Sequence, residues 1–306
     1  MIKQTYTNYF TKNIDLINMK LKNRRKVKFG SKIIGEGEKI PFIAEIGVNH
    51  LGSLKNAFNL VDAAIDAGSD FLKLQTYNSQ KRYDKKNPKY KEFTELVTKW
   101  QLSKSEEKEV WAHARSRGAE IFTSVYDLES VSFAEKLGTI GYKIAAFEMN
   151  NMPLLREVIK TKKPIIISCG MTNFKEIKNL TEFLDKKKSN YILLHTVSSY
   201  PLQEIYSNLY KIRNMIELFD CPIGHSDHTA GTYIPPIAAA CGAQIIEKHF
   251  TINPKSRFSD NFFSVTKEQV KEIKFNLEKI HNIIYSPDFK KNNPEKFMKD
   301  FKKIIS

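Results

Sequence analysis

The chain has 306 residues and carries 49 Lys and Arg against 34 Asp and Glu, which gives a net charge of +15. With 41% hydrophobic and 27% charged residues, it has enough apolar side chains for a large core, and this excludes a disordered chain. Three cysteines cannot all pair within the chain, so we expect no disulfide framework and a cytoplasmic location. The sequence contains neither a membrane-spanning apolar run nor the apolar core of a signal peptide.

Short β-rich runs alternate with amphipathic stretches from residue 42 onward. The predicted strands are 42–46, 70–77, 120–125, 141–146, 164–168, 191–195, 221–224 and 244–249. The predicted helices are 54–67, 104–117, 128–137, 153–160, 175–187, 206–218, 233–241 and 267–284. These strand-helix units predict an α/β protein with a (β/α)8 TIM barrel, and their total span is close to the roughly 250 residues typical of that fold.

The residues outside the repeating units divide into smaller segments. We expect residues 1–25 to be a poorly ordered leader and residues 286–306 to be a C-terminal tail. Residues 26–40 read as two short strands around a Gly-Ser turn, so a hairpin that closes the barrel bottom completes one domain over 26–285. The connection 78–100 is long and polar, and after a barrel strand such a connection is a candidate lid or substrate wall.

Polar residues at the C-terminal ends of the strands are the candidate site residues of a TIM barrel. Lys73 and Lys143 each stand inside an otherwise apolar strand. Such a lysine either forms a structural salt bridge, with Glu45 or Glu247 as partner, or meets an anionic ligand. Two lysines at one barrel mouth favour the ligand, because a phosphate or carboxylate group could pair with both.

His228 and His249 follow consecutive strands, so they would be neighbours in a closed barrel. A single histidine in such a place is more often a hydrogen-bonded core residue. Two imidazoles, with the carboxylates of Asp227, Glu247 and Asp260 near by, can bind a divalent ion such as Mn²⁺ or Zn²⁺. Two protein ligands are too few for a structural zinc site and would leave positions for water and substrate.

Several stretches of the sequence resemble the N-acetylneuraminate (sialic acid) synthase family. They are Phe42–Gly52, Lys73–Thr76, Cys169–Met171, Ser226–Gly231 and Ile246–Thr251, in the order of that family. The resemblance implies a transferase of carbohydrate biosynthesis that condenses phosphoenolpyruvate with an N-acylated amino-hexose. The products would be a nonulosonic, sialic-acid-like 2-keto sugar acid and phosphate, and the cofactor Mn²⁺ or Mg²⁺.

The resemblance also implies roles for residues at the strand ends. Glu45, Lys73 and Lys143 would be catalytic. His228 and His249 would bind the metal. The residues that would bind the two substrates are Gln75, Glu148, Ser168, Ser198, Tyr200, Ser226 and Asp260.

The sequence departs from the family pattern around the expected substrate pocket. Ala145 and Ala146 stand where many relatives carry a serine, and Ser198 stands where asparagine is common. Phe147 and the stretch 260–264 are closer to the pseudaminic acid synthase branch, whose substrate is a 6-deoxy diacetamido hexose. Pseudaminic or legionaminic acid synthase specificity is therefore an alternative.

The length of the tail is a further departure. Residues 286–306 are too few for the antifreeze-like C-terminal domain with which family members cover the site, so we expect a barrel without it. A homodimer, a separate cover-domain chain or the connection 78–100 could supply the cover. A catalytically weak phosphoenolpyruvate-binding barrel is the alternative function. Neither nucleic acid nor membrane is an expected partner, since lysine runs such as 186–188 lack interleaved aromatic residues.

Overall fold

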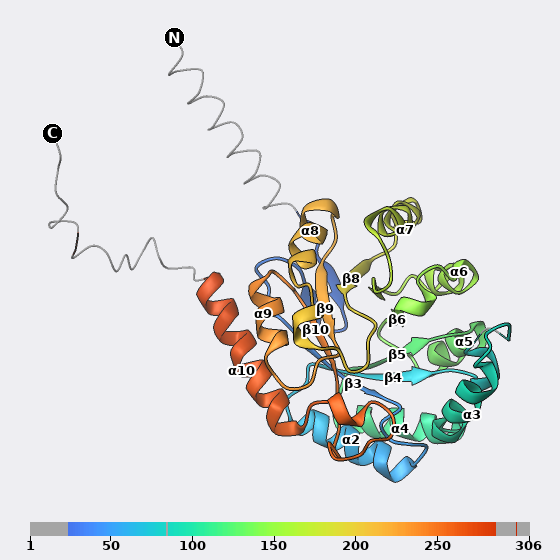
Figure 1. The fold of residues 1–306 in the computed structure, drawn as a ribbon. Helices are drawn as coiled ribbons and strands as arrows, with labels where there is room; N and C mark the ends of the chain where they lie inside the picture. Colours follow the sequence, from blue (N-terminus) through green and yellow to red (C-terminus); the bar gives the residue numbers. More distant parts are fainter. Residues whose placement is uncertain (1–23, 84, 286–297, 299–306) are drawn as a thin grey trace, which may run out of the picture.

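The computed structural model describes residues 24–83, 85–285 and 298. Eight parallel strands close into a barrel with helices outside them, and a two-stranded antiparallel sheet precedes the first barrel strand (Figure 1). The predicted TIM barrel with a short N-terminal hairpin is therefore confirmed. The predicted leader 1–25 and tail 286–306 lie almost entirely outside the described residues.

The barrel strands follow one another around the barrel in chain order, and the last pairs with the first. They are β3 (Phe42–Gly47), β4 (Phe71–Thr76), β5 (Ile121–Val125), β6 (Tyr142–Ile144), β7 (Ile165–Ser168), β8 (Tyr191–His195), β9 (Ile223–Asp227) and β10 (Ile246–His249). The prediction for β9 ended at Gly224, but the strand continues to Asp227. Its last residues are polar because they reach the mouth of the barrel, and this polarity concealed the strand in the sequence.

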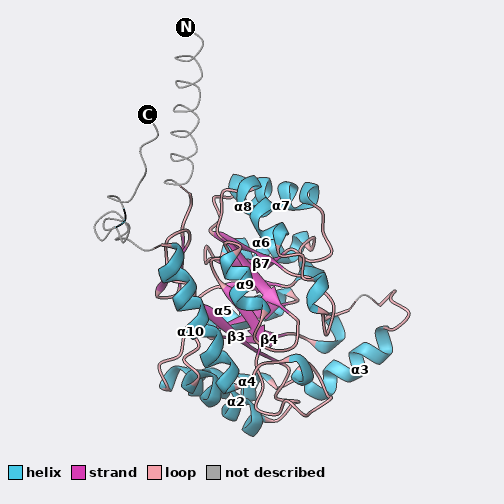
Figure 2. Cartoon of the chain, turned by 60° about the vertical axis from the view of Figure 1, so that its left-hand side comes forward, coloured by secondary structure: helices cyan, strands magenta, loops and turns pink. Residues whose placement is uncertain are grey.

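Helices surround the strands and bury one face against them (Figure 2). They are α2 (Leu54–Asp66), α4 (Lys104–Ser116), α5 (Leu128–Lys136), α6 (Met152–Lys160), α7 (Phe174–Lys186), α8 (Tyr210–Leu218), α9 (Ile234–Ala240) and α10 (Lys267–Ile284). α8 begins later than predicted, because Glu204–Tyr206 forms a separate 3-10 helix, η3. Within the described part of the chain, every helix is too short or too polar to cross a bilayer.

The connection between β4 and α4 contains helical structure that the sequence did not reveal. It holds the 3-10 helix η1 (Ser79–Lys81) and the helix α3 (Tyr90–Trp100). Thr94 and Val97 are the buried residues of α3, so its apolar stripe is narrow. A Lys-rich, Glu-rich composition around that stripe is typical of a loop, and it explains why the helix was missed.

The hairpin closes the N-terminal end of the barrel. Its strands β1 (Val27–Phe29) and β2 (Lys32–Ile34) pair antiparallel. The Phe29 ring packs edge to face against Phe71 and Phe122, with centroids 5.2 Å and 4.8 Å away. These rings belong to an apolar cluster that contains the first inward residues of several barrel strands. Apolar side chains therefore fill the barrel at the N-terminal ends of its strands, and the polar inward-facing residues lie at the C-terminal ends.

Candidate active site

Above the apolar layer, the inward positions of the strands are polar. The pairing register sets these residues in adjacent pairs: Glu45 with Lys73, Ser124 with Lys143, and Ser226 with Glu247. All of these side chains are buried. Because successive strand residues point to opposite faces, the inward ones share one lumen.

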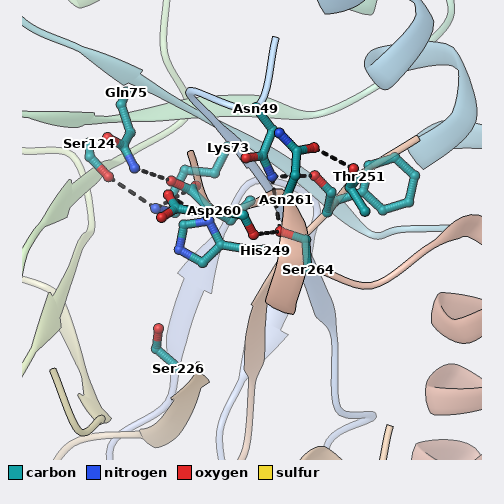
Figure 3. Close-up of polar contacts among 12 residues, drawn as sticks. Asn49, Lys73, Gln75, Ser124, Ser226, His249, Thr251, Asp260, Asn261 and Ser264 are labelled. Atoms are coloured by element: carbon teal, nitrogen blue, oxygen red, sulfur yellow. Dashed lines mark hydrogen bonds and ion pairs between the residues drawn. The ribbon is translucent and has the colours of Figure 1, made fainter. Parts of the chain in front are cut away.

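The two lysines form ion pairs with the two glutamates in this lumen. Lys73 Nζ lies 2.6 Å from Glu45 Oε2 and 3.6 Å from Glu247 Oε2. Lys143 Nζ lies 3.4 Å from Glu247 Oε1. Lys73 also donates a 3.0 Å hydrogen bond to Ser124 Oγ (Figure 3). The salt bridges considered from the sequence are thus present, while the binding of an anion by these lysines stays a prediction.

The two glutamates differ in how easily they take up a proton. Burial raises the pKa of Glu45 above its ordinary value, and attraction to Lys73 offsets only part of this rise. Burial would also raise the pKa of Glu247, but attraction to Lys143 and Lys73 outweighs it and lowers the pKa. Glu247 is therefore the permanent negative charge between the lysines, and Glu45 is the carboxyl group suited to proton transfer.

A cavity of about 250 Å³ opens among these residues at the C-terminal ends of the strands. The connection after β4 contributes one wall of it, through Arg82, Tyr83, Leu96, Val97 and Trp100. The volume suits a pair of small substrates better than a macromolecule. The connection 78–100 thus lies where a substrate wall was predicted.

Most of the predicted site residues line this cavity. They are Glu45, Lys73, Gln75, Lys143, Ser168, Tyr200, Ser226, His228, His249 and Asp260. Glu148 and Ser198 are not among the lining residues. The Glu148 carboxylate accepts a 2.6 Å hydrogen bond from Asn151, and Ser198 Oγ is buried near Gly170 and interacts with Tyr200. The structure brings the predicted groups together, and their roles stay predictions.

The two histidines are neighbours at the cavity, with ring centroids 5.7 Å apart. His228 Nδ1 lies 2.9 Å from the carbonyl oxygen of Val197, and a hydrogen bond donated from Nδ1 leaves the Nε2 lone pair free. Burial lowers the pKa of His228 to about 4. Burial and the neighbouring His228 hold the pKa of His249 well below its usual value. Both imidazoles are therefore neutral at pH 7, which is the form that binds metals.

An unpartnered nitrogen on His249 fits the predicted metal. His249 Nδ1 is buried without a hydrogen bond to the described residues, and Asp260 Oδ2 is 3.5 Å away. Neutral imidazoles beside carboxylates suit a divalent ion such as Mn²⁺. Among the residues the structure describes, three or more His, Cys, Asp or Glu side chains nowhere gather as a ready metal site. Water or substrate would have to complete the coordination.

The Asp227 carboxylate lies close enough to attract His228, as expected, but Asp227 is not among the residues that line the cavity. Ser226 and His228 point into the lumen, so Asp227 between them points to the outer layer. There its Oδ2 lies 2.5 Å from Lys248 Nζ and accepts a hydrogen bond from Thr229. Asp227 therefore fixes the end of β9 from outside.

The loop that carries Asp260 is tied to the first barrel strand. Buried Asn49, just after β3, donates 2.9 Å hydrogen bonds to the Phe250 carbonyl and to Ser264 Oγ. Ser264 Oγ in turn donates to the carbonyl oxygen of Asp260 at 2.6 Å. Figure 3 shows Asp260 and His249 beside Lys73 at the centre of this network. The position of Asp260 is thus set by hydrogen bonds across the closure of the barrel.

Arg82 is a charged cavity residue that the sequence did not reveal. Its guanidinium carbon lies 4.3 Å from the Tyr77 ring centroid and 4.2 Å from that of Tyr126. Its Nη2 donates a 2.9 Å hydrogen bond to Gln75 Oε1, and Gln75 Nε2 donates a 2.8 Å hydrogen bond to Glu45. In the sequence Arg82 is one cation of many, and only the tyrosines at two neighbouring strand ends could have distinguished it.

The fold and the site define a barrel enzyme with cations, a carboxyl group and two neutral imidazoles at one mouth. The chain belongs to the NeuB family, whose sequence profile matches residues 60–287. It is 34% identical over 247 residues to the N,N'-diacetyllegionaminic acid synthase of Campylobacter jejuni, covering 76% of this chain and 74% of that one. It is 32% identical over 250 residues to the pseudaminic acid synthase of the same species, covering 76% and 71%.

A solved structure shows the same architecture. The N-acetylneuraminic acid (sialic acid) synthetase of Leptospira borgpetersenii superposes with a TM-score of 0.85 at 30% identity, covering 91% of this chain and 96% of that one. The predicted family is therefore confirmed. The prediction of a transferase of the N-acetylneuraminate synthase-like class is confirmed with it.

Proposed function

We propose that the chain condenses phosphoenolpyruvate with an N-acylated amino-hexose to give a nonulosonic 2-keto sugar acid and phosphate. The observation that carries this proposal is the cavity itself, where Lys73 and Lys143 lie buried beside Glu45 and the two histidines. Two buried cations that line one small cavity suit the phosphate and the carboxylate of one small anion. Neutral imidazoles suit a metal ion that would polarise the aldehyde oxygen of the uncharged second substrate.

Lys73, Lys143, Ser168 and Ser226 would hold phosphoenolpyruvate at the bottom of the cavity. The lysines give up part of their pairing with the glutamates for the new anion, which limits the desolvation cost of binding. Gln75, Tyr200 and Asp260 are more exposed than the two lysines and would contact the open-chain sugar. The two substrates are thereby stacked along the barrel axis, with reacting carbons between Glu45 and the histidines.

The reaction forms one carbon–carbon bond and replaces the carbon–oxygen bond to phosphate by one to the oxygen of water. The enol carbon of phosphoenolpyruvate attacks the aldehyde carbon of the sugar, whose oxygen takes up a proton from Glu45 and becomes a hydroxyl, and positive charge develops on the carbon that bears the phosphate. Water adds to this carbon while Glu45 accepts its proton, and collapse of the tetrahedral intermediate releases phosphate. Holding both substrates and water in register contributes up to roughly 7 to 11 kcal/mol.

His228 and His249 would hold the cofactor, Mn²⁺ or Mg²⁺. When bound, such an ion supplies Lewis-acid polarisation of the sugar's aldehyde oxygen. The imidazole donors favour Mn²⁺ over Mg²⁺, which prefers oxygen ligands.

A phosphate-release assay with the purified chain, Mn²⁺ and phosphoenolpyruvate tests the proposal. The sugar panel contains N-acetylmannosamine and the 6-deoxy diacetamido hexoses that give legionaminic and pseudaminic acids. We expect equal amounts of phosphate and 2-keto acid with one of them. Binding of phosphoenolpyruvate without phosphate release from any sugar would instead establish the weak binding barrel.

The cavity mouth favours a 6-deoxy diacetamido sugar within this panel. Phe147 and Tyr200 line the cavity and are 65% and 43% exposed, so both rings offer apolar surface to a ligand. Apolar contact stabilises a methyl group by about 25 cal/mol per Å² and offers no partner to a hydroxyl. We therefore expect the diacetamido sugars to show lower KM values than N-acetylmannosamine, and the reverse order would assign sialic acid synthase specificity.

A further inference from the structure

Arg82 presents an unused hydrogen-bond donor at the cavity. The rings of Tyr77 and Tyr126 are perpendicular to each other and both contact the guanidinium, and Nη2 donates a 2.9 Å hydrogen bond to Gln75 Oε1. Nη1 is buried and makes no hydrogen bond of normal geometry to the described residues, while Tyr83 also interacts with the guanidinium. An unsatisfied buried donor costs about 1–3 kcal/mol, and more when charged, so an acceptor that arrives with a ligand would remove this cost.

The charge around Arg82 indicates a neutral acceptor. Arg82 attracts the carboxylate of Asp260, which also lines the cavity. It attracts the carboxylate of Glu148 as well. Two carboxylates thus already lie in the field of this one cation. A second anion there would add negative charge, whereas a carbonyl oxygen satisfies the donor without adding any.

The surroundings of Arg82 suit a small apolar group next to that oxygen. Tyr77, Tyr126, Val48 and Val97 form a buried apolar cluster, and Trp100 and Ala145 pack against it. Val97, Trp100 and Ala145 also line the cavity. A short acyl group combines the two properties, since it has a neutral carbonyl oxygen and a methyl group on the same carbon.

We propose that Arg82 binds the acyl group of the amino sugar, with Nη1 donating to the carbonyl oxygen and the methyl group packing against Val97 and Trp100. This inference rests on the proposed function for the identity of the second substrate. It makes Arg82 a specificity-determining residue, supplied by the connection after β4. The two lysines at the cavity bottom would be independent of it.

The test compares the wild-type chain with Arg82→Met and with a matched control, Lys81→Met. Lys81 is the neighbouring cation, and it pairs with Glu129 at the surface. Dissociation constants are measured by calorimetry for N-acetylmannosamine, for a 6-deoxy diacetamido hexose, and for mannose and 6-deoxymannose, which lack the acyl group. The affinity for phosphoenolpyruvate is measured in the same samples.

We expect Arg82→Met to weaken binding of the preferred acylated sugar by about 10- to 100-fold and to leave the acyl-free sugars unchanged. Phosphoenolpyruvate binding and the Lys81→Met variant should match the wild type. Equal weakening of acylated and acyl-free sugars would overturn the inference, and so would a wild-type chain that does not discriminate between them.

Two further results separate this inference from the proposed function. Discrimination that depends on Arg82 without any phosphate release would support the inference and contradict the proposed function. Phosphate release that Arg82→Met leaves unchanged would do the opposite. If Arg82→Met does not fold, Arg82→Lys replaces it, because lysine keeps the charge but lacks the planar set of donors that a guanidinium offers.

Discussion

Glu45 joins the two halves of the polar network, since its carboxylate meets Lys73 on one side and Gln75 on the other. We predict that Glu45→Gln lowers the rate of phosphate release by about 10²- to 10⁴-fold, the usual contribution of a general acid or base. The amide keeps the shape of the side chain, so phosphoenolpyruvate should still bind. Steady-state kinetics and a binding titration of the same protein check this.

The surface variant Glu129→Gln serves as the control for Glu45→Gln, because Glu129 pairs with Lys81 outside the cavity. Its rate should equal that of the wild type. A Glu45→Gln enzyme that retains a third or more of the wild-type rate would remove Glu45 from the chemistry.

Glu107 on α4 is a buried carboxyl outside the cavity, and burial raises its pKa to about 7. It hydrogen-bonds to Thr76, which lies 2.8 Å from Thr123 Oγ1. Because the folded chain holds this proton more tightly than the unfolded chain, folding stability falls as the pH rises from about 4.5 to about 7. We predict a loss of about 3 kcal/mol across this window.

Urea unfolding of wild type and Glu107→Gln at pH 5 and pH 8 measures this effect. The glutamine variant should lack the Glu107 part of the pH dependence and should be more stable than the wild type at pH 8. Glu109→Gln, an exposed change on the same helix, is the control. Identical pH dependence in wild type and Glu107→Gln would contradict the prediction.

At the scale of the elements, a bulge in β3 makes room for the network. The pairing of β3 with β4 shifts between Glu45 and Gly47, where Gly47 has φ +52°. A Cβ on Gly47 would lie 3.1 Å from Glu45 Oε1 and 3.2 Å from Gln75 Nε2. Glycine thus permits both the left-handed turn and the hydrogen bond between those two side chains.

We predict that Gly47→Ala costs about 1–2 kcal/mol of stability through the left-handed backbone and also lowers activity by displacing Glu45. Gly68→Ala is the matched control, because Gly68 has φ +79° and nothing within 4 Å of an added Cβ. Both variants should lose stability in urea unfolding, but only Gly47→Ala should lose activity. Equal activity in the two would show that the bulge does not position Glu45.

The helices and strands that could be predicted are those whose sequence shows one clear pattern of apolar residues. The barrel strands are short β-rich runs, and glycines such as Gly118 and Gly138 mark the helix ends before them. The helix α3 was not predictable, because only Thr94 and Val97 face the core and the rest of its sequence is polar. The end of β9 was hidden for a related reason, since strand residues at a site are chosen for chemistry and not for β-propensity.

At the scale of the whole molecule, most cavity residues followed from the barrel, since strand order alone makes His228 and His249 neighbours. Arg82 did not follow, because its place depends on how a long connection folds. The net charge of +15 did not help to locate the candidate site either. Among the described residues, only Lys73, Lys143 and Lys248 are buried lysines, so the positive charge belongs mainly to the surface.

The barrel closes through its own strand pairs, so the fold should not depend on the metal. We predict that EDTA abolishes phosphate release, that added Mn²⁺ restores it, and that circular dichroism shows the same helical content throughout. His228→Ala and His249→Ala should each require more Mn²⁺ for half-maximal rate. Full activity in EDTA would contradict the proposed metal, and unfolding in EDTA would give it a structural role instead.

Because the hairpin and its apolar cluster fill the N-terminal end of the barrel, the cavity opens at the C-terminal ends of the strands in the part of the chain that the structure describes. Phosphoenolpyruvate, bound at the lysines, would sit behind the sugar, so a sugar that arrives first would block its way. Productive binding therefore requires a compulsory order of arrival, with the acid before the sugar. A non-reactive sugar analogue that enters first keeps phosphoenolpyruvate out, so in initial-rate kinetics it should raise the KM for phosphoenolpyruvate. Inhibition that leaves this KM unchanged would indicate a second entrance.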